Sequence, residues 1–141
     1  MPSRERVAAL IALVEQGMLV DALNEFYADD AQAQDNQEPP RQGRNRLVAN
    51  ARHLQRSVRG LRVWPVDGFH VDGDHVQIHW AFEFTGHDGR RRVQHELAQQ
   101  RWRDDRIVEE QLHYDPVQQP LVLDPLAAVV SAPVPRYEVM P

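Results

Sequence analysis

"RVQHELAQQRWRDDRIVEEQLHYD", residues 92–115, is the stretch that decides the fold. It contains two runs in which side chains of different character alternate, and a period of two predicts β-strands with one buried face. "RDDR", residues 103–106, separates the runs and predicts a tight turn. The runs therefore form an antiparallel hairpin. An earlier run, "VQIHWAFEF" at residues 76–84, joins this hairpin through "HDGR", residues 87–90.

The chain before these strands has the periodicity of helices. Ser3 can cap a first helix, in which apolar residues recur at helical spacing: Val7, Leu10, Ile11, Val14 and Met18. A second short helix buries Leu19 and Leu23, a strand follows at residues 31–36, and a third helix is expected over residues 43–55. Three helices followed by an antiparallel meander predict an α+β domain.

Composition limits the partners and the chemistry. A chain of 141 residues with 42% hydrophobic content is expected to be a single domain with a real core. The net charge is −5 and all sixteen basic residues are scattered arginines, which argues against a nucleic acid partner. The chain has no cysteine, so disulfide and thiolate chemistry are excluded. No apolar run approaches the roughly 20 residues that cross a bilayer. The first residues lack a signal-peptide core, so a cytoplasmic location is expected.

The turns predict a strand register if residues 88–89 and 104–105 are two-residue loops, because Leu97 then lies between Trp80 and Leu112. One face of the sheet would carry Trp80, Phe82, Phe84, Val93, His95, Leu97, Gln99, Val108, Glu110, Leu112 and Tyr114. The opposite face would carry Gln77, His79, Glu83, Glu96, Gln100, Trp102, Gln111 and His113. The first face is expected to meet the helices. A β-bulge would shift the register by one residue and exchange the faces.

Four polar residues interrupt this aromatic face: His95, Gln99, Glu110 and Tyr114. An unpaired buried polar group costs about 1–3 kcal/mol, so a solid core disfavours such a cluster. Polar groups on an aromatic wall are typical of a ligand pocket. The alternative is that these residues lie at a fraying sheet edge and contact water.

Four sequence features resemble the nuclear transport factor 2-like superfamily, which includes ketosteroid isomerase, the polyketide cyclase SnoaL and scytalone dehydratase. They are "FYADDAQAQD" at residues 26–35, the double proline that follows, Gly43 before a helix, and "RWRDDRIVEEQLHYD" at residues 101–115. The resemblance covers residues 7–115. It implies a cone-shaped α+β barrel, in which a curved, mostly antiparallel sheet wraps around three N-terminal helices and encloses a pocket. We therefore expect a SnoaL-like domain at residues 1–115.

The resemblance also implies a role for Asp35. In ketosteroid isomerase, the aspartate that ends the strand after "YADDA" is a general base, and Asp35 has this position. A carboxylate against aromatic walls loses hydration, which raises its pKa toward the working range of a base. The two oxyanion donors of the isomerase are not matched: the first-helix position is Ile11, and the late-strand position falls on Ala98 or Gln99. The ketosteroid isomerase reaction itself is therefore not expected.

Our hypothesis is a pocket protein that acts as a lyase, isomerase or cyclase on a small apolar carbonyl compound. Asp35 would be the base, and His95 and Tyr114 would orient the substrate or stabilise oxyanion charge, unless these two residues only satisfy each other. The substrate-binding residues would be Tyr27, Trp80, Phe82, Leu97, Gln99, Glu110 and Leu112. The alternative is a non-catalytic ligand-binding or dimerisation module, in which Asp35 anchors a loop by accepting backbone N–H groups before Pro39.

No cofactor and no metal are expected. His79 and His113 share a predicted face with Glu83 and Glu96, but their spacing matches no zinc signature, so a metal-dependent enzyme is only a third reading.

Aromatic residues on the outer sheet face often mark a partner surface, so Trp64 and Trp102, assigned there by alternation, suggest a homodimer. Residues 116–141 are rich in proline and aliphatic residues and are expected to form a lid or a dimer arm.

Overall fold

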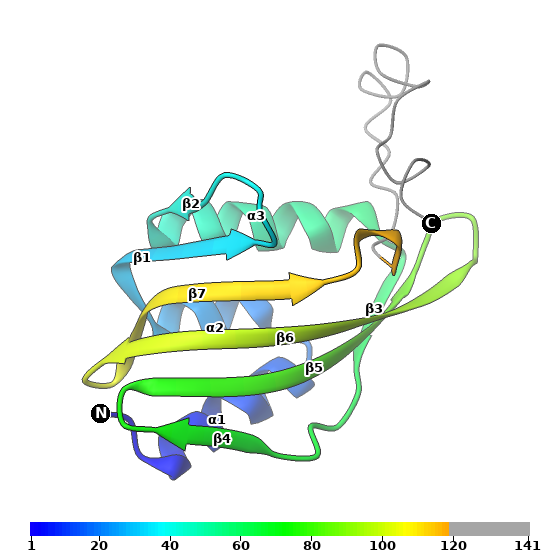
Figure 1. Ribbon diagram of the computed structural model, residues 1–141. Helices are drawn as coiled ribbons and strands as arrows, with labels where there is room; N and C mark the ends of the chain where they lie inside the picture. The colour runs from blue at the N-terminus through cyan, green and yellow to red at the C-terminus, as the bar shows by residue number, and fades with distance from the viewer. Residues whose placement is uncertain (119–141) are drawn as a thin grey trace.

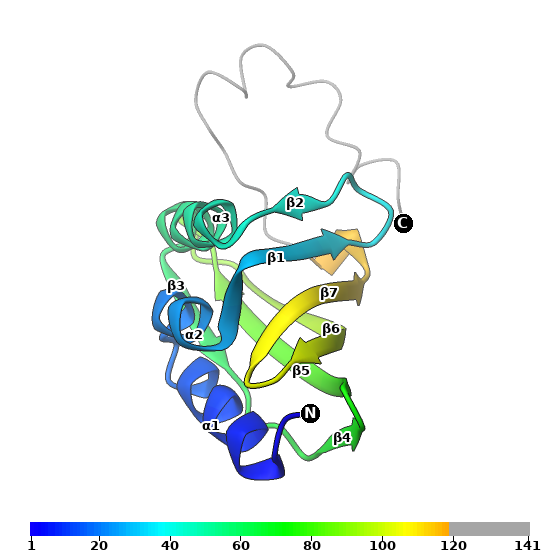
Figure 2. The same ribbon diagram turned by 90° about the vertical axis from the view of Figure 1, so that its left-hand side faces the viewer.

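The computed structural model describes residues 1–118 and shows a curved sheet with three helices on one face (Figures 1 and 2). The sheet has the strand order β2-β1-β7-β6-β5-β3, and β4 also pairs with β5. Only the β1–β7 pair is parallel. The elements are α1 (Arg4–Glu15), α2 (Leu19–Phe26), β1 (Tyr27–Asp35), β2 (Arg41–Gln42), α3 (Arg44–Ser57), β3 (Gly60–Val63), β4 (Phe69–Asp72), β5 (His75–Thr85), β6 (Arg91–Arg103), β7 (Arg106–Tyr114) and η1 (Pro116–Gln118). The predicted cone-shaped α+β architecture is confirmed.

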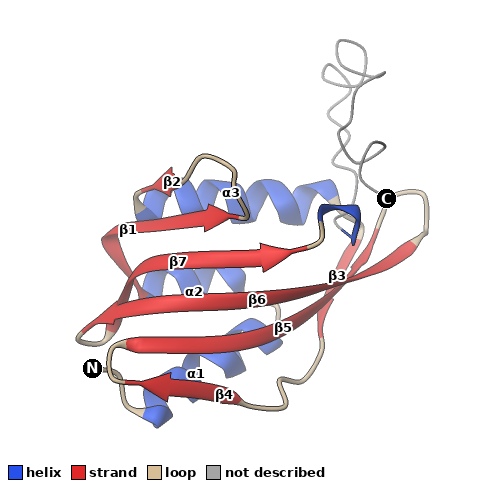
Figure 3. Ribbon diagram, in the orientation of Figure 1, coloured by secondary structure: helices blue, strands red, loops and turns tan. Residues whose placement is uncertain are grey.

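The helices begin where the sequence predicts. The Ser3 side chain accepts a hydrogen bond from the backbone N–H of Arg6 at 3.0 Å and caps α1. The buried face of α1 consists of Val7, Leu10, Ile11 and Val14. Gly43 precedes α3 with a φ of 92°, a conformation that glycine adopts without strain. The helices lie against the inner face of the sheet, between its edges (Figure 3).

The predicted register is wrong for β6, for two local reasons. A two-residue loop at residues 88–89 would pair Thr85 with Arg92, but Thr85 pairs with Arg91. The β5–β6 loop is therefore one residue longer than expected. The β6–β7 turn at Asp104 is as short as predicted, but the pairing shifts between Arg101 and Trp102. Each irregularity moves the register by one residue, as a bulge must.

The two shifts invert β6 and leave its neighbours unchanged. Trp80 now pairs with Glu96, and Glu96 pairs with Tyr114. The inner face of β6 therefore carries Gln94, Glu96, Ala98, Gln100 and Trp102, all of which are buried. The aromatic residues of β5 and Glu110, Leu112 and Tyr114 of β7 line the inner face as predicted. Ile107 and not the predicted Val108 joins the core beside Trp102, because the pairing shifts there.

Trp102 belongs to the core and not to the outer face, because it lies on the inverted strand. It is 1% exposed, and its Nε1 donates a hydrogen bond to Gln100 Oε1 at 3.1 Å. Trp64, the other tryptophan assigned to the outer face, is 39% exposed.

The sequence also raised the questions of a C-terminal tail, a membrane-spanning helix and a metal site. The expected tail at residues 116–141 lies outside the described residues, except for η1. Among residues 1–118, no helix is long and apolar enough to cross a membrane. The same residues contain no group of three or more histidine or acidic side chains that could hold a metal ion.

Candidate active site

A cavity of about 240 Å³ lies between the helices and the inner face of the sheet. Its apolar walls come from α1, α2 and α3 on one side and from the aromatic residues of β5 on the other. Most of the predicted site residues line it: Tyr27, Asp35, Trp80, Phe82, Glu110, Leu112 and Tyr114. The structure thus brings these residues together around one apolar space, as a ligand pocket requires.

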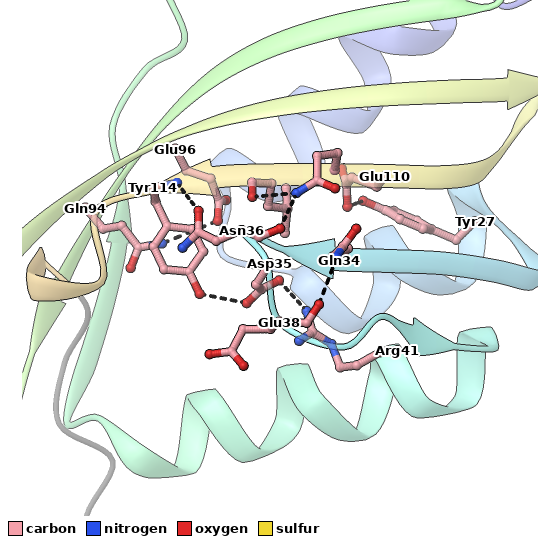
Figure 4. A network of polar contacts seen from close by, with 12 residues as sticks. Tyr27, Gln34, Asp35, Asn36, Glu38, Arg41, Gln94, Glu96, Glu110 and Tyr114 are labelled. Atoms are coloured by element: carbon pink, nitrogen blue, oxygen red, sulfur yellow. Dashed lines mark hydrogen bonds and ion pairs between the residues drawn. The ribbon is translucent and has the colours of Figure 1, made fainter. Parts of the chain in front are cut away.

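Asp35 ends β1 and faces the cavity. It follows the buried residues Ala31 and Ala33 at strand alternation, which directs its side chain inward. Its Oδ1 lies 2.6 Å from Arg41 Nη2, and its Oδ2 accepts a hydrogen bond from the Tyr114 hydroxyl at 2.8 Å (Figure 4). In the described chain, these contacts are to side chains, and the predicted anchoring by backbone N–H groups is not what holds the carboxylate.

Glu96 lies on β6 and is 7% exposed. Burial raises its pKa to about 8, and the negative charges of Glu110 and Asp35 act in the same direction. Its Oε1 accepts a hydrogen bond from Gln94 Nε2 at 3.3 Å. At neutral pH this carboxyl is mostly protonated, so it can donate a proton or a hydrogen bond.

Glu110 is the third acid of the cavity wall, and both of its oxygens accept hydrogen bonds. Oε1 accepts from the Tyr27 hydroxyl at 2.6 Å, and Oε2 accepts from Gln100 Nε2 at 2.7 Å. Burial raises the pKa of Glu110, and burial with the nearby Glu110 charge raises the pKa of Tyr27 well above its ordinary value. Together with the Trp102 indole, these groups form one continuous buried network.

Three predicted site residues lie on the outer face of the sheet: His95, Leu97 and Gln99. None of them lines the cavity, because β6 is inverted. The His95 ring packs edge-on against Trp64 at 6.3 Å between centroids, and Gln99 Oε1 lies 2.9 Å from His113 Nε2. The predicted pairing of His95 with Tyr114 is therefore wrong.

Sequence reasoning missed Arg41, Gln94 and Glu96. One feature of the sequence could have identified Gln94 and Glu96. Trp102 shares their alternation on β6, and a large aromatic residue is more often buried than a glutamine or a histidine. Arg41 follows the double proline, and nothing in its sequence neighbourhood predicts that it folds back onto Asp35.

The chain matches the model of one protein family. The family model described as the SnoaL-like domain matches residues 7–110. The chain belongs to the SnoaL-like domain family. No curated protein matches the chain significantly.

Solved structures support this SnoaL-like fold. A candidate SnoaL-like polyketide cyclase from Mesorhizobium loti is 24% identical with a TM-score of 0.68, and the match covers 81% of this chain and 100% of that one. A protein from Catenulispora acidiphila with a ketosteroid isomerase-like fold, in complex with trimethylamine, is 19% identical with a TM-score of 0.70, over 83% and 90% of the chains. An epoxide hydrolase from M. tuberculosis is 19% identical with a TM-score of 0.66, over 92% and 95%. At these identities the likeness shows the fold alone.

Proposed function

We propose that this SnoaL-like protein is an acid–base catalyst, of the isomerase, lyase or cyclase type, for a small uncharged apolar carbonyl compound. One observation carries the proposal. The cavity holds two carboxyl groups in different surroundings: Asp35 forms an ion pair with Arg41, and burial raises the pKa of Glu96 to about 8. An ion-paired carboxylate and a protonated carboxyl group in one cavity can act as a base and an acid at the same pH.

Asp35 would take a proton from the carbon next to the carbonyl group. A carboxylate offers about four lone-pair positions, and Arg41 and Tyr114 use two of them, so the remaining positions can accept a proton. Glu96 would donate its proton or a hydrogen bond to the carbonyl oxygen, on which negative charge develops. Return of the proton from Asp35 to another carbon would complete an isomerisation, and loss of a leaving group would complete an elimination.

Apolar side chains of the cavity would hold the rest of the substrate. Trp80, Phe82 and Leu112 line it beside the acids, and Tyr27 holds Glu110 by a hydrogen bond. Glu96 would take the role that the sequence suggested for His95.

Hydrogen–deuterium exchange tests this proposal without knowledge of the natural substrate. The probe is α-tetralone, a bicyclic apolar ketone, in deuterated water, with proton NMR of the carbon beside the carbonyl as the readout. The protein should accelerate exchange, and Asp35→Asn should reduce the acceleration by ~10²–10⁴. The rate should fall above about pH 8, where Glu96 loses its proton. Equal exchange rates with the wild-type protein and Asp35→Asn would contradict the assignment of the base.

A binding protein without catalysis is the second candidate, and the Asp35–Arg41 ion pair favours it. Arg41 Nη2 lies 2.6 Å from Asp35 Oδ1, so this oxygen is already bonded and is not available to a substrate. In this case the protein would bind α-tetralone in an equilibrium titration, and exchange would not be accelerated.

We also propose a homodimer that forms through the outer sheet face. The exposed Trp64 and the adjacent His95 support it, since aromatic groups on an outer sheet face often contact a partner. Sedimentation of the wild-type protein and of Trp64→Arg tests it. A dimer that the substitution dissociates is expected, and a wild-type monomer would contradict it.

A further inference from the structure

Two buried polar atoms of the cavity wall lack a hydrogen-bond partner among residues 1–118: Arg41 Nε and Gln94 Oε1. Both side chains line the cavity, and Gln94 is 4% exposed. An unsatisfied buried polar group destabilises the folded protein, so two of them beside one pocket need a physical reason. One is a donor and the other is an acceptor. A ligand that bonds to both would remove the cost.

The existing hydrogen bonds of the two side chains determine which bonds each can still form with a ligand. Arg41 Nη2 is engaged by Asp35, and Arg41 Nε is a buried donor without a partner in the described chain, so Nε can bind a ligand. Gln94 Nε2 donates to Glu96 Oε1, so Oε1 is the acceptor left. Figure 4 shows the two side chains on either side of the Asp35–Tyr114 pair. The site thus offers a donor at one end and an acceptor at the other.

We infer that Gln94 and Arg41 determine specificity, and that they select a neutral carbonyl compound that also carries a hydroxyl group. The hydroxyl would donate to Gln94 Oε1, and an acceptor oxygen of the ligand would bind Arg41 Nε. Gln94 and Glu96 are two residues apart on one strand face, about 7 Å along the strand. The hydroxyl therefore lies within a few bonds of the carbonyl group that Glu96 would serve, a detail that rests on the proposed function.

Charge at the site argues against an anionic ligand. The Arg41 guanidinium is matched by the Asp35 carboxylate, and the other acids of the wall are Glu96 and Glu110. No positive charge remains unmatched among these groups. A carboxylate or phosphate would lose its hydration without gaining a free cation, which is unfavourable. A hydroxyl group satisfies Gln94 without this cost.

Equilibrium binding tests the inference with three matched probes. They are α-tetralone, its ring-hydroxylated derivatives tested one position at a time, and the corresponding methyl ethers, which keep the oxygen but cannot donate. At least one hydroxylated derivative should bind the wild-type protein roughly 3- to 10-fold more tightly than both its methyl ether and the parent ketone. This comparison needs no variant, so it does not depend on how a substitution folds.

Two substitutions then assign the contacts. Gln94→Met keeps the length of the side chain and should abolish the preference for the hydroxyl. Arg41→Lys keeps the charge beside Asp35 but has no Nε, and it should weaken the binding of ketone and hydroxyketone alike. Binding is measured without turnover, so absent deuterium exchange would defeat the proposed function and leave this inference standing. Equal affinities for the hydroxyl and methoxy probes, no binding of any hydroxylated probe, a preference that survives in Gln94→Met, or tighter binding of a matched naphthoate would overturn it.

Discussion

At the scale of single residues, Asp35 and Glu96 show how neighbours set the state of a carboxyl group. Both line the same apolar cavity. Asp35 has a guanidinium and a phenol on its oxygens, whereas Glu96 has one amide donor and two acids nearby. Burial favours the neutral form of a carboxyl group. For Glu96, burial and the two nearby acids outweigh the opposing charge of Arg41, which forms its ion pair with Asp35.

Glu96→Gln should change how stability depends on pH. Because the pKa of Glu96 is raised on folding, the folded protein keeps a proton that the unfolded chain has already lost. This contribution to the free energy of unfolding is complete below the ordinary pKa of 4.5 and is lost as pH rises to about 8. The slope from one proton is at most about 1.4 kcal/mol per pH unit. Denaturant unfolding between about pH 5 and pH 8 should therefore show a flatter dependence in the variant.

Glu109→Gln is the matched control for this experiment. Glu109 is exposed, and the hydrogen bond from Arg101 lowers its pKa, so it does not titrate in this range. It should retain the wild-type slope. Glu110, which has a raised pKa, leaves some slope in both variants. The same slope in Glu96→Gln and in the wild-type protein would show that Glu96 is ionised throughout.

Sequence reasoning at this scale identified Asp35 through the resemblance to the superfamily, in which the residue that ends this strand is the base. It missed Glu96 because a glutamate between a histidine and a leucine has the character of a solvent-facing residue. Only the pairing of β6 with both of its neighbours decides which way Glu96 points.

At the scale of elements, β6 is the strand whose orientation decides the chemistry of the pocket. Its sequence offers a plausible inner face in either register, with His95, Leu97 and Gln99 or with Gln94, Glu96 and Ala98 as the inner set. The helices and the strands β5 and β7 were predictable because their apolar periodicity has one solution. A loop one residue longer and a shift in pairing near Trp102 are set by backbone geometry, which the side-chain pattern does not encode.

Single cysteines test the orientation of β6 directly, since the natural chain has none. Gln99→Cys should react quickly with a maleimide in the folded protein, because this position is exposed. Ala98→Cys, at a position that is 0% exposed, should react slowly until the protein is denatured. The register expected from two-residue loops requires the reverse order of reactivity, so a faster reaction at position 98 would contradict the structure.

At the scale of the whole molecule, the fold leaves a cavity beside its packed core. The largest fully buried side chains include Trp102, Leu10 and Ile78, which belong to one core cluster. The cavity lies beside this packed region, where α2 and α3 meet the polar residues of β6 and β7. Stability and ligand binding thus belong to adjacent parts of a single core.

Replacing each tryptophan separately tests this division. Trp102→Ala should lower the free energy of unfolding by about 3–5 kcal/mol, because it empties a packed site and leaves the Gln100 amide without its partner. Trp64→Ala should cost much less, since this side chain is 39% exposed. Chemical denaturation of the two variants measures the difference. Similar losses from both substitutions would mean that Trp102 is not part of the packed core.

The central claim is that one apolar cavity holds an acid and a base, and carbon NMR of protein labelled at glutamate Cδ tests it most directly. The account predicts a glutamate carboxyl signal that titrates near pH 8 and is missing from the spectrum of Glu96→Gln. If every glutamate signal titrates close to the ordinary value of 4.5, Glu96 is ionised at pH 7 and cannot be the proposed proton donor.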